Sequence, residues 1–171
     1  MSLGTADSVS ARTNLEALLF EISAQRYALP LCDVIEVLRA VAIRSLPKSP
    51  AITLGIIDVR GEIIPVLDVR RRFALPPKPL DPSDHFLLGQ AGPRRVALHV
   101  DRALGISMLA VVPLAAAGNL PGALEHVAGV AATESGLVLI HDLHAFLSQA
   151  EAEQLEAALP GAEQLAEPAA E

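Results

Sequence analysis

Two histidines have the residue type and the spacing that most suggest chemistry. His141 and His144 lie three positions apart in the stretch HDLHAFL, with Asp142 between them. On a helix that spacing could present two imidazoles to one metal ion. A third convergent ligand is not apparent in the sequence. We therefore expect these histidines to cap a helix or to face solvent, and a metal hydrolase remains only a third hypothesis.

The other motifs that would indicate catalysis are missing from the sequence. It contains neither a GxxxxGK[ST] nor a GxGxxG phosphate loop, and no GxSxG nucleophile elbow. Cys32 is the single cysteine, which excludes an internal disulfide framework and a cysteine-rich zinc site, and we expect it to be buried. The sequence thus predicts a protein that is not an enzyme, with no catalytic residue, no metal and no cofactor.

Two charged residues stand inside apolar runs. Glu36 lies in CDVIEVLRAV and Arg60 lies in IIDVRGEII. A charge in such surroundings is costly unless it is paired or reaches water. One interpretation is a structural salt bridge or ordinary surface placement. The other is a docking surface, in which exposed Val34, Val37 and Ile57 surround the two charges. Composition alone does not choose between them.

Composition limits the kind of protein that this chain can be. Hydrophobic residues make up 51% of the 171 residues, but aromatic residues only 3%, so the core must be mainly aliphatic. The net charge is −7, and from position 150 onward there are six Glu and no Lys or Arg. A nucleic-acid partner would need a one-sided basic surface, and none is evident.

The two ends of the chain differ from the middle. We expect a flexible leader over residues 1–16, with no signal peptide. At the other end, residues 151–159 predict a helix that stops at Pro160 and Gly161. Residues 103–124 carry no charge, but their glycines and prolines favour a strand and a loop over a membrane-spanning helix.

The sequence repeats itself at a distance of about 70 residues. Residues 20–33 resemble residues 86–101, and residues 55–69 resemble residues 129–143. Each copy indicates a hairpin, a connecting strand, a second hairpin and a short helix. Two similar β-barrels pressed together would bury such apolar strands and remove their open edges.

Details of the repeat support an all-β fold with short helices. Asp68 and Asp142 are positioned to cap the two short helices, and Pro65 is expected at an edge or a bulge. The Pro-rich stretch 75–82 would link the halves. A single mixed α/β sheet is the alternative, but the chain lacks the long helices that parallel crossovers need.

One stretch carries a specific resemblance. Residues 55–69, GIIDVRGEIIPVLDV, follow the pattern G-(V/I)-x-N-(L/V)-R-G-x-(I/V)-(I/V)-P-(V/I)-(I/V/L)-D-(L/V). YALP at 27–30, V-x-EV at 34–37, LP at 46–47, VD at 100–101 and GLVLIHDLHAFL at 136–147 accompany it. Over about residues 17–148 the chain resembles the CheW-like proteins, the adaptors of bacterial chemosensory arrays.

The resemblance implies a fold and a function. The fold would be two SH3-like five-stranded β-barrels sharing a hydrophobic core, in one CheW-like domain over 17–148. Its halves, of about 17–74 and 84–148, would be intertwined at the termini, and an acidic helix or tail over 149–171 would follow. The function would be a non-enzymatic scaffold that couples transmembrane chemoreceptors to a sensor histidine kinase. Its partners would be the receptor's cytoplasmic domain and the kinase's regulatory domain. Its place would be the cytoplasm, at membrane-anchored receptor arrays, without nucleic acid and without insertion into the membrane.

The resemblance also implies a partner-binding site. Its positions, associated with receptor docking, kinase coupling or the shape of that surface, are Val34, Glu36, Gly55, Asp58, Arg60 and Gly61, with Glu36 and Arg60 as suspected partners. Asp58 stands where the family usually has Asn, and its carboxylate could pair with Arg60 and weaken the reach of that side chain. The basic run 70–72 is either a further partner contact or a solvated helix face.

Two alternatives stay open at this point. The chain could be a paralogous CheW-like adaptor of a non-flagellar chemosensory pathway, such as surface sensing or pili. From another class, it could be a small-molecule sensor that uses the cleft between the barrels.

Overall fold

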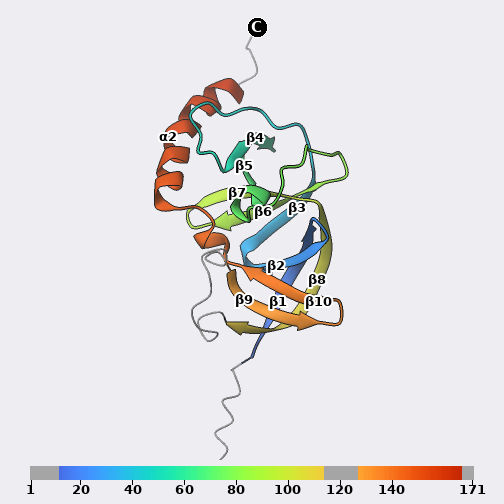
Figure 1. Cartoon of the computed structure of the whole chain (residues 1–171). Helices are drawn as coiled ribbons and strands as arrows, with labels where there is room; N and C mark the ends of the chain where they lie inside the picture. Colours follow the sequence, from blue (N-terminus) through green and yellow to red (C-terminus); the bar gives the residue numbers. More distant parts are fainter. Residues whose placement is uncertain (1–11, 114–126, 167–171) are drawn as a thin grey trace, which may run out of the picture.

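The computed structural model describes residues 12–113 and 127–166. Its strands form two five-stranded sheets, which lie one above the other in Figure 1. The first, barrel A, is closed in the order β1-β2-β10-β9-β8. Its strands are β1 (Thr13–Ile22), β2 (Gln25–Pro30), β8 (Arg102–Pro113), β9 (Val127–Thr133) and β10 (Gly136–His141).

The second sheet, barrel B, has the order β3-β6-β7-β5-β4. A bridge between Arg44 and Ile56 brings the chain that follows β3 back to β4, so the sheet curls toward closure. Its strands are β3 (Val34–Arg39), β4 (Thr53–Val59), β5 (Glu62–Asp68), β6 (His85–Ala91) and β7 (Arg94–Val100). The helical segments are η1 (Leu31–Asp33), α1 (Val69–Arg72), η4 (Leu143–Ala145) and α2 (Gln149–Ala166).

The predicted repeat is present, but its halves are not the barrels. The order hairpin, strand, hairpin, short helix holds for β1 to α1 and again for β6 to η4. Each barrel combines one hairpin of one repeat with the strand and hairpin of the other. The expected halves 17–74 and 84–148 therefore each contribute to both barrels, because β1 pairs with β8 and β5 pairs with β7.

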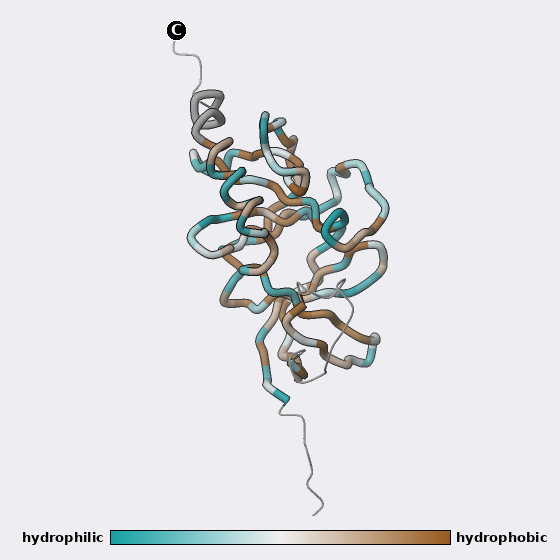
Figure 2. Tube along the Cα trace, turned by 60° about the vertical axis from the view of Figure 1, so that its left-hand side comes forward, coloured by the Kyte–Doolittle hydropathy of each residue, from teal (hydrophilic) through white to brown (hydrophobic). Residues whose placement is uncertain are grey.

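Buried side chains form a cluster inside each barrel and a shared cluster between the barrels. Barrel A encloses small and aliphatic residues, including Ala17, Val138 and Ile140. Barrel B encloses a cluster around Ile64 and Phe86. A third cluster draws 14 buried residues from strands of both barrels and from the segments between them, and forms the shared core. In Figure 2 hydrophobic and hydrophilic stretches alternate along the tube, and hydrophilic stretches are common at the outward-facing turns.

The short helices begin where the sequence predicts. The carboxylate of Asp68 accepts a hydrogen bond from the backbone N–H of Arg71 at the start of α1, at 3.3 Å. Asp142 accepts one from the N–H of His144 at the start of η4, at 3.0 Å. Both aspartates thus satisfy donors that a first helical turn leaves free.

Pro65 lies in an interior strand, not at an edge or a bulge. Its partner in β4 is Ile56, whose N–H and C=O both bond to Arg44 on the other side. The nitrogen of Pro65 therefore points away from β4, and β7 pairs with β5 only from Val66 onward. No ladder hydrogen bond is lost through the missing donor.

Three local expectations differ from the structure. β1 begins at Thr13, inside the predicted leader 1–16, of which residues 1–11 lie outside the described part. Cys32 is exposed in η1, because that turn lies outside the buried strands. The backbone of α2 continues through Pro160 and Gly161 to Ala166, since the flanking segments are rich in Ala, Leu, Glu and Gln, which are strong helix formers.

Within the described residues, the helices are too short or too polar to cross a membrane. The uncharged stretch 103–124 begins as β8, as predicted, and the loop expected after it falls on residues 114–126, outside the described part.

Candidate functional site

The tip of the β4–β5 hairpin is a two-residue turn. Val59 and Glu62 form the last strand pair, and Arg60 and Gly61 connect them. Both have positive φ, 51° and 88°, as a type I′ turn requires. Glycine adopts this conformation freely, whereas a residue with a Cβ is disfavoured there by about 1–2 kcal/mol. The turn therefore holds Arg60 in a conformation that it would seldom adopt by itself.

Asp58 closes this turn. Its Oδ1 accepts a hydrogen bond from the backbone N–H of Gly61 at 2.7 Å. The ion pair that the structure gives Arg60 is with Glu36, so the expected local pairing of Asp58 with Arg60 is not observed among the described residues. An Asn side chain has a carbonyl oxygen that could accept the same bond. The Asp at this position thus has a structural role in the turn.

Glu36 and Arg60 form the suspected pair. The guanidinium meets the carboxylate with both nitrogens, Nη2 to Oε2 at 2.5 Å and Nη1 to Oε1 at 3.4 Å. The hydrogen bond from Arg60 outweighs partial burial and holds the pKa of Glu36 below its usual value. The side chain of Arg60 is 72% exposed. A pair so open to water adds little to folding stability, but it fixes the direction of both side chains.

Two of the predicted site residues lie beneath the exposed surface around Glu36 and Arg60. Val34 is half-buried and packs against the shared core. Gly55 has φ 152°, and a Cβ there would lie 2.2 Å from the carbonyl oxygen of Arg44. Both residues set the position of their strands and offer little surface to a partner. Glu36, Asp58, Arg60 and Gly61 are thus brought together at the hairpin tip, and Val34 and Gly55 are not.

Apolar side chains lie exposed on the same barrel. Val37 follows Glu36 in β3 and is 38% exposed, as predicted. Ile57 is buried inside barrel B, so its predicted exposure is wrong. Ile35 and Val41 are 44% and 52% exposed, and sequence reasoning missed both. Strand alternation would place Ile35 on the same side as the exposed Val37. The sequence does not show this alternation clearly, because apolar residues stand on both sides of Glu36.

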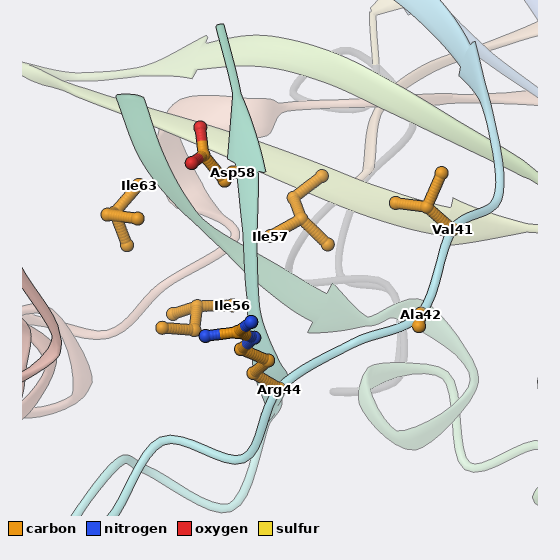
Figure 3. A pocket seen from close by; sticks show the side chains of 7 residues that line it. All are labelled: Val41, Ala42, Arg44, Ile56, Ile57, Asp58 and Ile63. Atoms are coloured by element: carbon orange, nitrogen blue, oxygen red, sulfur yellow. The ribbon is translucent and has the colours of Figure 1, made fainter. Parts of the chain in front are cut away.

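A pocket of about 370 Å³ adjoins the hairpin. In Figure 3 the side chains of Arg44 and Asp58 stand at opposite ends of the labelled group, with Ile56 and Ile57 between them. Because the lining is mainly aliphatic, with one cation and one carboxylate, it offers an apolar contact surface but no pair of groups suited to acid–base chemistry. The lining residues are Val41, Ala42, Arg44, Ile56, Ile57, Asp58 and Ile63.

The basic run 70–72 is mostly internal. Arg70 is buried and bonds both carboxylate oxygens of Asp101 at 2.7 Å. Arg72 bonds Glu151 of α2 at 2.6 and 2.7 Å. Of the three arginines only Arg71 is exposed. We expected this run to be either a partner contact or a solvated helix face. Neither holds for Arg70 and Arg72, because both link distant parts of the fold.

The two histidines of the opening motif do not converge. His141 is buried and stacks on Phe73, with ring centroids 4.3 Å apart. Nδ1 of His144 accepts from the N–H of Gly92 at 3.1 Å, and its Nε2 lies 3.2 Å from the carboxylate of Asp33. Groups of three or more potential metal ligands do not occur among the described residues.

The fold and the site define a class of protein: a double β-barrel whose candidate site is an exposed surface suited to a macromolecular partner. Comparison with known proteins gives the family. A model of the CheW-like domain matches residues 16–151. The chain therefore belongs to the CheW-like domain family.

Individual relatives agree with this assignment. The chain is 30% identical to protein FrzA of Myxococcus xanthus over 133 residues, which cover 76% of this chain and 82% of that protein. It is 28% identical to a probable chemotaxis protein CheW of Rhizobium etli, with 81% and 90% covered. The crystal structure of the scaffolding protein TtCheW from Thermoanaerobacter tengcongensis has the same fold, with a TM-score of 0.72 at 24% identity over 81% of this chain and 96% of that one.

Proposed function

We propose that this chain is a non-enzymatic scaffold of a chemosensory pathway. In this role it couples the cytoplasmic domain of a transmembrane chemoreceptor to the regulatory domain of a sensor histidine kinase, at receptor arrays on the cytoplasmic side of the membrane. The observation that carries the proposal is the exposed Glu36–Arg60 pair at the tip of the β4–β5 hairpin, in a chain of the CheW-like family. Relatives named as chemotaxis and scaffolding proteins support it.

The pair is suited to recognition. Arginine is favoured at the centre of interfaces, and its fixed direction here lowers the entropy lost on binding. The exposed aliphatic residues Ile35 and Val37 precede and follow Glu36 in β3, and because they alternate with it in burial, the apolar area that they offer lies on the other side of that strand. A scaffold of this kind acts by binding one state of the kinase better than another and so shifting the population.

Charge reversal at the pair tests the proposal. In Arg60→Glu two carboxylates face each other and the docking cation is lost, while the fold stays intact because the side chain is 72% exposed. Receptor cytoplasmic fragments and kinase from the same cell would be mixed with the variant. We expect loss of co-sedimentation and loss of receptor-dependent kinase rate, with an unchanged unfolding midpoint.

Arg95→Glu is the matched control. Arg95 pairs with Glu62 of the same hairpin at 2.9 Å, and both side chains are 48% exposed. It removes a comparable surface pair whose carboxylate directly follows the turn, so it separates loss of the Glu36–Arg60 pair from a general change of charge at the hairpin. If Arg60→Glu couples receptor and kinase as well as Arg95→Glu does, the hairpin tip is not the docking site. If Arg60→Glu unfolds, Arg60 is structural and the proposal loses its main support.

The proposal covers flagellar and other chemosensory outputs alike, and the same reconstitution with kinases of each pathway separates them. The sensor alternative receives less support. The junction between the barrels is filled by the buried residues of the shared core, including Phe20, Leu87 and Leu143.

A further inference from the structure

The outer face of the β4–β5 hairpin is covered by helix α2. Ile57 and Ile64 belong to the interior cluster of barrel B, so the alternation of a strand places Ile56 and Ile63 on the outside. Leu155 and Leu159 of α2, one turn apart, are buried against Ile56. Figure 1 shows α2 running beside the barrel that contains β4 and β5. The α2-binding face, as we name it, comprises Leu46, Ile56 and Ile63.

Basic residues flank this face and bind carboxylates of α2. Arg72 binds Glu151, four residues before Leu155, at 2.6 and 2.7 Å. Arg94 binds Glu156, directly after Leu155, at 3.0 Å. The face is therefore complementary to a helix with two aliphatic residues four positions apart and a carboxylate on either side of the first. Binding of such a helix is a form of helix-in-groove recognition.

The α2 helix carries its own N-terminal cap, and its attachment to the face is small. Ser148 and Glu151 form a reciprocal cap, with Ser148 N–H to Oε1 at 3.0 Å and Glu151 N–H to Oγ at 3.1 Å. The cap makes the first turn locally stable, whether or not the helix is docked. The attachment itself consists of few buried side chains and two ion pairs, and Glu156 is 65% exposed, so salt weakens part of it.

The covered face continues into open surface. Ile56 and Ile63 contact α2 and also line the pocket beside Asp58 and Arg44. A helix that replaced α2 could extend its contacts into that pocket. The α2 helix also lies almost wholly beyond residues 16–151, the part that matches the family.

We propose that the α2-binding face is a docking site for an acidic amphipathic helix of a partner protein, and that α2 is its intramolecular competitor. The partner's helix carries the pattern of α2: two aliphatic residues four apart, with carboxylates that pair with Arg72 and Arg94. Docking of that helix displaces α2. This proposal stands independently of the receptor and kinase assigned above.

The test uses a labelled synthetic peptide of residues 147–166 as the probe. The full chain is compared with the variant Leu155→Asp/Leu159→Asp, in which α2 cannot stay on its face. Fluorescence anisotropy should show peptide binding to the variant at least about tenfold tighter than to the intact chain, because α2 leaves only a fraction of the intact sites free. A peptide with the same two aspartates should not bind.

Either of two results with the double variant overturns the proposal. One is a folded variant that does not bind the peptide, which means that the face does not accept a helix in trans. The other is equal binding by variant and intact chain, which means that α2 does not compete. Adding Arg94→Glu to the double variant should weaken its binding of the peptide. A peptide that carries Glu156→Arg should restore that binding. If the double variant does not fold, Glu156→Lys in the full chain replaces it, and peptide affinity no higher than that of the intact chain overturns the proposal.

Discussion

Removal of one buried arginine should destabilise the whole molecule. The guanidinium of Arg70 bonds both carboxylate oxygens of Asp101 at 2.7 Å, and the hydroxyl of Ser23 at 2.6 Å. Ser23 lies in the β1–β2 turn of barrel A, whereas Arg70 lies in α1, which follows strand β5 of barrel B. Arg70→Ala therefore cuts a connection between the barrels and leaves Asp101 without its main partner.

The size of the effect follows from the exposure of the pair. Breaking a fully buried ion pair costs about 3–5 kcal/mol, because a charge is left without compensation. Arg70 is 8% exposed, but Asp101 is 23% exposed and can recover some hydration. We expect a loss of about 2–3 kcal/mol in the free energy of unfolding, measured by urea denaturation at pH 7. Arg71→Ala, on the exposed side of the same helix, should change it by less than about 0.5 kcal/mol.

The pH dependence gives a second readout. Burial opposes the ionisation of Asp101, but the hydrogen bonds from Arg70 and from the N–H of Ser23 outweigh it and lower the pKa of this carboxyl. A lowered folded pKa adds stability above the unfolded value, about 3.9, and that stability is lost as pH falls through the folded pKa. In Arg70→Ala the main cause of the lowering is gone, while burial remains.

The stability difference between the wild type and Arg70→Ala should therefore be largest near neutral pH and shrink below about pH 4. Equal stability of Arg70→Ala and Arg71→Ala at pH 7 would refute the connection between the barrels. A difference that stays constant down to acid pH would show that lost packing, and not the carboxylate, accounts for the cost.

Two further predictions concern the hairpin. Gly55→Ala should cost about 3 kcal/mol, because its Cβ would lie 2.2 Å from a backbone oxygen, whereas Gly61→Ala, with nothing within 4 Å of its Cβ, should cost about 1 kcal/mol from its positive φ alone. Thermal or urea unfolding compares them, and equal losses would contradict the steric argument. Asp58→Asn should keep the bond to the N–H of Gly61 and change stability by less than about 0.5 kcal/mol, whereas Asp58→Ala should cost about 1 kcal/mol and speed hydrogen exchange of that amide. Identical exchange in both variants would argue against Asp58 as the closing acceptor.

The sequence was sufficient to predict the elements of the fold but not their partners. Apolar runs, turn residues and capping aspartates act over a few positions, so the order of hairpins, strands and short helices could be read directly. The pairing of β1 with β8 joins residues about 90 positions apart, and nothing local specifies it. For the same reason the sequence predicts two halves intertwined at the termini but does not identify which hairpin of each half belongs to the other barrel.

The direction and the burial of a side chain were harder to predict than the position of the strand or helix that carries it. The pairing of Glu36 with Arg60 could be suspected, because both charges interrupt apolar runs and the family resemblance connects them. Ile57 was misplaced, since a continuous apolar run such as GII does not show which side chain points inward. Arg70 and Arg72 looked like solvent-facing residues of a basic run, because their partners Asp101 and Glu151 are distant in sequence.

The second copy of the repeat helps to separate folding from function at the hairpin tip. The β9–β10 hairpin turns through Glu134 and Ser135, and Thr133 stabilises it with bonds to Ser135 and Gly136. A turn in this part of the repeat therefore closes without an arginine. In the first copy, Arg60 occupies a left-handed conformation and pairs with Glu36 at a surface where the bond adds little stability. A strained residue whose contacts do not repay its strain is more readily explained by recognition than by folding, which is the physical reason to test Arg60 first.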